Sequence, residues 1–257
     1  MIHSQYELIL YSAKDHISFL TNKVDADLHR HHYIQCTIGL EEDVQLRTEG
    51  ETFRARGIMI PSHVSHQLPG LQKWQWYILI NPESAFGESW VQRMGPNLNI
   101  SLLNEHQVSS MLRLAYQLLD PIDPTAYEQV MKRCRQILGL CDVDTEFPLD
   151  DRIREALLYI DEHPLPGLTV GALSRLLYLS ESRLSHLFKQ EVGITLSSYL
   201  VHRKFEAAFH AVFNGSSITA AALEAGFSSS SHFTRTVRDK LGMAPRSIVQ
   251  NSRYMQV

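Results

Sequence analysis

Polar and basic side chains recur at matching positions in two segments near the C-terminal end of the chain. With an offset of 49 residues, Leu184–Ile194 lies over Phe233–Met243, and Lys189 recurs as Arg238. In both segments hydroxyl, imidazole and cationic groups fall between apolar residues of helical spacing, so they share the outward face of a helix. Such groups donate hydrogen bonds to base edges and pair with phosphates. The repeat therefore indicates two heads that contact nucleic acid, and the sequence shows no nucleophile motif or Gly-rich phosphate loop that would indicate catalysis.

The elements that position these side chains are predicted to be two helix-turn-helix units. In the first unit, Thr169 caps a short helix and the chain breaks at Tyr178–Ser180. Ser180 then caps a second helix that ends at Gly193, where a left-handed residue costs least. The inward face of this second helix consists of Leu184, Leu187 and Phe188.

The second unit repeats this pattern. Ser217 caps a helix over 218–225, and Gly226 makes the turn. A second helix follows over 229–241 and ends at Gly242. In each unit the second helix is the one expected to enter a major groove.

A connector joins the two units. Thr195–Phe213 is an amphipathic stretch of 19 residues, which as a helix spans ~28 Å. Two recognition helices that read one face of B-DNA need centres ~34 Å apart. A stiff connector of this length therefore suits two heads on one DNA face.

These residues resemble the DNA-binding domain of AraC-type transcription regulators. The resemblance covers about residues 152–250, and it implies a fold with two helix-turn-helix motifs. The chain departs from the AraC-type pattern at two places. Ala220-Ala221 stand where the family has an acidic residue and Ile, and Val237 stands where it has Phe. These departures leave open which residue pairs with Arg203. The matching elements are Leu168-Thr169, Leu179-Ser180-x-Ser182-x-Leu184-Ser185-x-Leu187-Phe188-Lys189-x-Glu191-x-Gly193, Tyr199-Leu200-x-x-x-Arg203, Ser217-Ile218, Ala225-Gly226-Phe227-Ser228-Ser229-x-Ser231-x-Phe233-Thr234-Arg235 and Gly242-x-x-Pro245.

Position by position, the resemblance implies DNA contacts from the second helix of each unit. Arg235 is the best candidate for a base contact, because a guanidinium can grip guanine O6 and N7 with two hydrogen bonds. Lys189 and Arg238 are expected on phosphates, with Arg183 a weaker candidate. The predicted DNA-binding residues are Ser182, Arg183, Ser185, His186, Lys189, Ser230, Ser231, Thr234, Arg235 and Arg238.

The first part of the chain is predicted to be β-structure followed by two helices. To about Ile80, short runs of alternating residues are broken by glycines and Pro61, as in an antiparallel sandwich or barrel. From about Asn104 the period lengthens to that of a helix, and two amphipathic helices are expected over 108–119 and 125–140. These helices either pack on the sheet or form a dimer seam, and the two roles are compatible.

Histidines are the other concentrated feature. His29 and His31 place two imidazoles on one strand face, and His66 would complete a set with Gln35 where a carboxylate would be expected. The arrangement, over about 25–80, resembles a cupin. The three imidazoles either hold Zn or Fe, or hydrogen-bond a small molecule in a metal-free pocket, or are ordinary surface residues. Gln35 favours the metal-free pocket, so no metal or other cofactor is expected. The predicted effector-binding residues are His29, His31, Gln35, His66 and Trp76, and the predicted ligands for any metal are His29, His31 and His66.

The fold class that follows is α+β with two domains. Residues 1–140 form a cupin-like β-barrel with a helical pair, 141–150 an acidic linker, and 151–257 an all-α DNA-binding domain. Residues 1–150 carry 12 basic and 19 acidic residues, whereas 151–257 carry 12 and 9, so the basic segment holds the repeat. No apolar run approaches the ~18 residues of a membrane span, and the first residues do not resemble a signal peptide, so a cytoplasmic location is expected.

The leading hypothesis is therefore a sequence-specific transcription regulator rather than an enzyme. It would bind double-stranded promoter DNA, respond to a small-molecule effector in the N-terminal barrel, form a homodimer and contact RNA polymerase. Activation is the commoner outcome in the family that it resembles. One alternative is a metal-dependent cupin enzyme fused to a DNA-binding domain, and another is an architectural DNA binder without a ligand.

Overall fold

A computed structural model divides the chain into two compact units, which are described separately. Residues 1–143 and 237–257 form the first unit, and residues 144–236 form the second. Residues 141–149 of the predicted linker lie outside the described residues, and so do Gly193 and Gly242. The described residues are 6–13, 15–24, 26–69, 72–82, 84–94, 99–140, 150–192, 194–241, 244–250 and 252–257.

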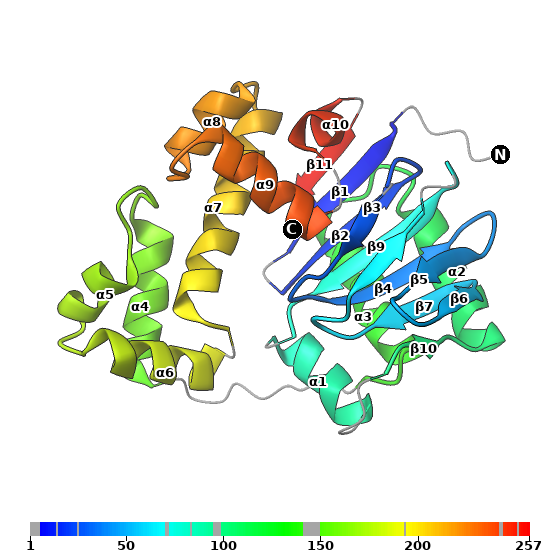
Figure 1. Cartoon of the computed structure of the whole chain (residues 1–257), viewed down its shortest axis with the longest axis horizontal. Coiled ribbons are helices and arrows are strands. Elements are labelled where there is room, and N and C mark those ends of the chain that lie inside the picture. Colours follow the sequence, from blue (N-terminus) through cyan, green and yellow to red (C-terminus); the bar gives the residue numbers. More distant parts are fainter. Residues whose placement is uncertain are drawn as a thin grey trace. The chain divides into compact units, whose positions relative to one another are not determined.

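The first unit is built on two β-sheets (Figure 1). Seven strands form one sheet in the order β10-β7-β4-β9-β2-β1-β11, and four strands form the other in the order β3-β8-β5-β6. Apart from the parallel pair of β1 and β11, the neighbouring strands with a described register are antiparallel. The strands are β1 Leu8–Ser12, β2 His16–Thr21, β3 Ala26–His29, β4 Ile34–Gly39, β5 Val44–Arg47, β6 Thr52–Ala55, β7 Gly57–Ile60, β8 His66–Leu68, β9 Gln75–Ile80, β10 Ser101–Leu102 and β11 Ser252–Gln256.

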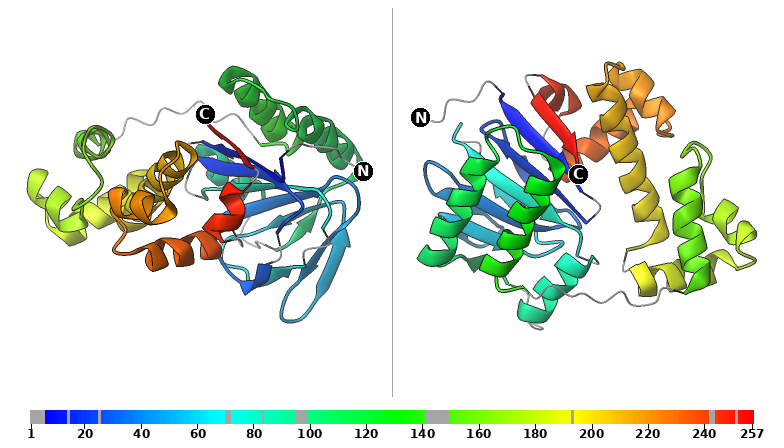
Figure 2. Two further views of the ribbon diagram at one scale, coloured as in Figure 1. Left: turned by 90° about the horizontal axis from the view of Figure 1, so that it is seen from above. Right: turned by 180° about the vertical axis from the view of Figure 1, so that it is seen from behind.

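Helices cover one face of the seven-stranded sheet. Helix α1 spans Ala85–Met94, α2 spans Glu105–Gln117 and α3 spans Pro124–Ile137, and α2 and α3 lie across the sheet in Figure 2. Their apolar residues join Trp76 and Ile78 of β9 in one core. The predicted helical pair therefore packs on the sheet. Helix α1 was not predicted.

The opposite face of this sheet carries polar side chains that are nevertheless buried. Alternate residues of a strand point to opposite faces, so the Trp76 face of β9 cannot also contain Gln75 and Tyr77. Register places Tyr77 opposite Thr37 of β4, and Gln35 of β4 lies 2.8 Å from His31, which follows β3 of the second sheet. The polar face therefore turns toward the four-stranded sheet.

The last residues of the chain belong to this first unit. Strand β11 pairs in parallel with β1, from Leu8 opposite Ser252 to Ser12 opposite Gln256. The expectation of an all-α segment to residue 257 is therefore wrong at its end. Parallel pairing between segments this far apart in sequence has no local signal of its own.

The second unit contains the helical repeat. Helix α9 begins in this unit, and its last residues, from Val237, together with α10 belong to the first unit. The two predicted helix-turn-helix units correspond to α5 with α6 and to α8 with α9, and the predicted connector is α7. The helices are α4 Asp151–Glu162, α5 Val170–Leu176, α6 Glu181–Val192, α7 Leu196–Phe213, α8 Ile218–Glu224, α9 Ser230–Leu241 and α10 Pro245–Val249.

Side-chain caps set the helix starts where the sequence placed them. The hydroxyl of Thr169 accepts the amide of Ala172 at 3.1 Å, and that of Ser217 accepts the amide of Ala220 at 3.1 Å. Ser180 and Ser229 accept amides at the starts of α6 and α9 in the same way. Each cap satisfies an amide that has no partner within its helix.

Candidate nucleic-acid interface and histidine cluster

Helix α6 presents a polar outer face above a buried inner face. Leu184, Leu187 and Phe188 are buried, and the Phe188 ring packs against Tyr199 of α7 with 5.4 Å between ring centroids. Because these inner residues fix the rotation of the helix, the predicted contact residues must face outward. The outer residues are Ser182, Arg183, His186 and Lys189, which are exposed, and Ser185, which is partly buried.

Helix α9 is arranged in the same way. Phe233 is fully buried against Phe209 of α7 and Phe227 of the turn, with centroid distances of 5.6 and 5.1 Å. Val237 is buried as well, one turn further along the helix. The remaining predicted residues face outward, with Ser231, Arg235 and Arg238 exposed and Ser230 and Thr234 partly buried.

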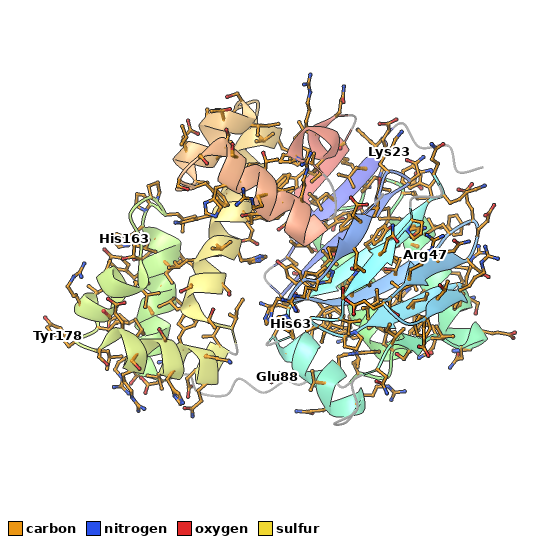
Figure 3. The ribbon with its side chains drawn as sticks, viewed as in Figure 1. Lys23, Arg47, His63, Glu88, His163 and Tyr178 are labelled. Atoms are coloured by element: carbon orange, nitrogen blue, oxygen red, sulfur yellow. The ribbon has the colours of Figure 1, made fainter. Side chains whose placement is uncertain are left out.

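The turn between α5 and α6, in the first helix-turn-helix, adds one residue that was not predicted from the sequence. Tyr178 lies between α5 and α6 with a positive φ of 54°, and its side chain is 95% exposed. Figure 3 shows it at the outer edge of the helical unit. An aromatic ring held in water beside the start of α6 is a further candidate for nucleic-acid contact.

The histidine cluster lies where the two sheets of the first unit meet. His29 of β3 and His66 of β8 are direct partners across their strand pair, and His31 follows β3. One ring nitrogen from each of the three histidines lies within 4.8 Å of the others. His31 and His66 are buried, whereas His29 is partly exposed. The structure therefore brings the three predicted residues together.

Burial keeps two of these imidazoles neutral. It lowers the pKa of His31 to about 3, and the charges of His66 and His29 act in the same direction. Burial also lowers the pKa of His66 to about 4, with a further contribution from His29. Both rings are therefore uncharged near pH 7.

Gln35 belongs to the cluster and Trp76 does not. Gln35 lies 2.8 Å from His31 Nε2 and 2.9 Å from the Thr37 hydroxyl. Trp76 is on the other face of the sheet, in the core beneath the helices, where its indole donates to Ser18 at 2.7 Å. The prediction that Trp76 shares a site with the histidines is wrong. Tyr77, its neighbour in sequence, lies on the Gln35 face instead, and burial raises its pKa.

A second histidine pair is separate from the cluster. His63, in the turn between β7 and β8, lies 3.1 Å from His32 through ring nitrogens, and the contact is exposed. His63 is labelled in Figure 3.

Comparisons with known proteins agree with this geometry. Residues 173–251 match a family model described as a helix-turn-helix domain. The chain is 25% identical over 228 residues to the probable transcriptional regulator LumQ of Photobacterium leiognathi, which covers 84% of this chain and 89% of that protein. It is 30% identical over 100 residues to the arabinose operon regulatory protein of Escherichia coli, of which it spans 34%. The C-terminal part of the chain is thus similar to the helix-turn-helix domain of AraC-type transcription regulators.

The fold of the whole chain also has a counterpart among solved structures. A crystal structure of apo ToxT from Vibrio cholerae aligns with a TM-score of 0.53 over 97% of this chain and 98% of that one, at 9% identity. Identity this low establishes the two-part fold alone: a sheet-rich N-terminal part and a helical C-terminal part. Among the described residues, no helix is long and apolar enough to cross a bilayer.

The departures from the AraC-type pattern are accommodated locally. Arg203 of α7 pairs with Asp161 of α4 at 3.0 Å and lies 3.7 Å from Glu206, so it has acidic partners without one at position 220. Ala221 and Val237 are both fully buried. The smaller side chains at these two positions are therefore still excluded from solvent.

Proposed function

We propose that this AraC-type regulator reads promoter DNA with two unlike heads, and that Arg235 supplies most of the base discrimination. The observation that carries the proposal is the outward face of α9, where Arg235 is exposed while Phe233 and Val237 hold the helix from behind. A guanidinium on such a helix can make two hydrogen bonds to one guanine. On α6 the outward hydroxyls and His186 can each make weaker contacts, and Lys189 suits a phosphate.

The test begins with duplexes that the protein selects from a random-sequence pool. Affinities of wild type and Arg235→Ala are then compared on a selected duplex and on a scrambled one at fixed salt. Loss of a bidentate base contact should weaken the selected duplex by about 1–3 kcal/mol, roughly 5- to 150-fold, and should relax preference at one or two base pairs. Equal losses on both duplexes would show that Arg235 contacts only the backbone.

Two further variants calibrate this measurement. Lys189→Ala should weaken both duplexes alike and reduce the salt slope by about 1, as expected for one lost phosphate contact. Arg154→Ala removes an exposed arginine that pairs with Asp151 at 2.6 Å on α4, and it should leave the ratio of the two affinities unchanged.

We also propose that a ligand in the first unit modulates this DNA binding. Support comes from the buried polar side chains between the sheets, because convergent polar groups in an apolar setting are typical of ligand sites. Gln35, Thr37 and Tyr77 are buried there beside His31 and His66. Trp76 is not part of this proposed site, because it lies on the other face of the sheet. A homodimer and a contact with RNA polymerase remain part of the proposal by analogy with the family.

Ligand coupling has its own experiment. Small molecules that raise the thermal midpoint of the wild type are tested on Gln35→Leu and then in the DNA-binding assay. A true effector should stabilise the wild type more than the variant and should change the affinity for the selected duplex. If every stabilising molecule left DNA affinity unchanged, the coupling would be refuted.

A further inference from the structure

The turns of the two helix-turn-helix motifs close with the same backbone hydrogen bonds but with different residues. The bonding amides are those of Tyr178 and Leu179 in the first turn and of Gly226 and Phe227 in the second. In each turn the first amide donates to the carbonyl three residues earlier and the second to the carbonyl five residues earlier, with N···O distances of 2.9 or 3.3 Å. This is the Schellman ending of a helix, in which one residue adopts a left-handed conformation. Tyr178 therefore occupies the position that Gly226 occupies in the second turn.

Tyrosine is an unfavourable residue for this position. Tyr178 has a φ of 54°, and Gly226 has a φ of 84°. In this conformation the Cβ of an L-residue lies too close to the following carbonyl oxygen, so glycine is preferred and a bulky residue is an outlier. The ring gains no packing in return, because Tyr178 is 95% exposed. Folding of the helical unit therefore does not explain this tyrosine, and strain of this kind asks for a functional explanation.

The place of Tyr178 beside α6 indicates what its ring can contact. Ser180, which caps α6, follows Tyr178 by two residues, whereas Ser229 follows Gly226 by three, so the first turn is the shorter. The N-terminal residues of a recognition helix approach base edges in the major groove. A residue just outside that end then meets the sugar-phosphate strand at the rim of the groove, where most protein–DNA hydrogen bonds are made. Figure 3 shows Tyr178 at the outer edge of the helical unit.

The charges on either side of this turn suit a phosphate. Arg175 near the end of α5 and Arg183 near the start of α6 are both exposed. Glu181 is exposed as well and carries the opposite charge, so residues 175–183 remain net positive. A tyrosine hydroxyl can donate to a phosphate oxygen while its ring packs on the sugar. Exposed basic and aromatic side chains in one short segment are typical of contact with a nucleic-acid backbone.

We propose that Tyr178 is a backbone-contact residue of the first head, and that its hydroxyl donates to a DNA phosphate beside the base pairs read by α6. The inference rests on the proposed function in one respect, since it requires that the helical unit binds duplex DNA. The second head lacks this contact, because Gly226 has no side chain at the equivalent position of its turn. A phosphate contact carries no sequence information of its own. Tyr178 therefore adds affinity and fixes the register of α6, and it does not select base pairs.

Tyr178→Gly in the full chain distinguishes a DNA contact from a structural role. Glycine adopts a left-handed φ without strain, so the midpoint of urea unfolding should rise or stay equal. The affinity for DNA should nevertheless fall roughly 3- to 10-fold, as expected for one lost hydrogen bond. The fall should be the same on the selected and the scrambled duplex, so that their affinity ratio is unchanged. Leu158→Ala, which truncates a 54% exposed side chain on α4 of the same unit, should change neither affinity.

Tyr178→Phe and ethylation interference locate the contact on the DNA. The phenylalanine variant keeps the ring and loses the hydroxyl, so its affinity should lie between those of the wild type and Tyr178→Gly. In the wild type, ethylation of one phosphate at the rim of the site read by α6 should weaken binding. Tyr178→Phe should become insensitive to ethylation of that phosphate and should remain sensitive at the others.

Two results would overturn the inference. Unchanged DNA affinity in Tyr178→Gly would show that the ring does not contact DNA and is left for a protein partner. A lower urea midpoint in the same variant would assign Tyr178 a structural role. Failure of the proposed function has a different signature, because the wild type would then select no duplex from the random pool, or Arg235→Ala would leave base preference unchanged.

Discussion

Removing the Arg253 guanidinium should release the last strand of the chain from the sheet. Nη2 of Arg253 lies 2.8 Å from the Tyr11 hydroxyl, 2.8 Å from the Leu118 carbonyl and 2.9 Å from the Asp120 carbonyl. Nη1 is 3.4 Å from the carbonyl of Leu119. The side chain thus fastens β11 to β1 and to the C-terminal end of α2, where a cation also interacts favourably with the helix dipole.

The free-energy cost of Arg253→Ala follows from the number of hydrogen bonds that Nη2 can donate. Nη2 has two hydrogens for its three acceptors, so about two full hydrogen bonds are lost in Arg253→Ala. Bonds from charged donors are worth about 1.5–3 kcal/mol each. Water can take over part of this bonding, because the contact with Asp120 is exposed. A net loss of about 2–3 kcal/mol remains, which raises the opening equilibrium of β11 roughly 30- to 150-fold.

Amide hydrogen exchange measures this opening directly. Peptides covering 252–257 should lose protection in Arg253→Ala, including the Val257 amide, which donates to the Ser12 carbonyl at 2.9 Å. Peptides from β4 and β9 should change little. Arg246→Ala on α10 removes an exposed arginine close in sequence and should leave β11 protected. Equal exchange in wild type and Arg253→Ala, or equal loss in both variants, would show that this arginine does not hold the strand.

Two further substitutions test the packing of each unit. Gly226→Ala should lower the free energy of unfolding in urea by about 2 kcal/mol or more, because Gly226 has a φ of +84° and a Cβ would lie 3.0 Å from the Pro166 Cα. Gly215→Ala is the matched control and should lower it by less, since Gly215 has a φ of +100° and a Cβ there would have nothing within 4 Å. If the two cost the same, the contact with Pro166 contributes nothing. Tyr127→Phe removes the hydroxyl 2.7 Å from His16 Nε2 in a buried setting, so the midpoint of thermal unfolding should fall by an amount equivalent to about 1–2 kcal/mol. An unchanged midpoint would mean that this hydrogen bond adds no net stability.

The helical unit was predictable because its signals are local. A hydroxyl before each helix of the two helix-turn-helix units, a glycine at the second turn and apolar residues at helical spacing can all be recognised within a few residues. The caps at Thr169 and Ser217 and the positive φ of Gly226 are where the sequence placed them. Once an inner face is known, the outer face follows, so the exposure of Arg235 required no tertiary information.

The sheets were predicted less completely, since pairing depends on partners that are distant in sequence. Strands β1 and β2 are buried at every position, so neither has an exposed face that would mark it as the edge of a core. Strand β11 pairs with β1, although most of the sequence lies between the two strands. Its own residues show no pattern that would predict a strand directly after a run of helices.

At the histidine site, strand periodicity predicts which residues of one strand share a face, but only the strand register shows which faces of neighbouring strands coincide. Alternation grouped His29 with His31, and the structure brings the two together although β3 ends at His29. It also put Trp76 on one face of its own strand with Ile78. It could not say which face of β9 matches which face of β4. The structure pairs Ile38 with Trp76 and Thr37 with Tyr77, and a shift of one residue would have exchanged the two faces. The register therefore decides that Tyr77, rather than Trp76, shares the histidine side of the sheet.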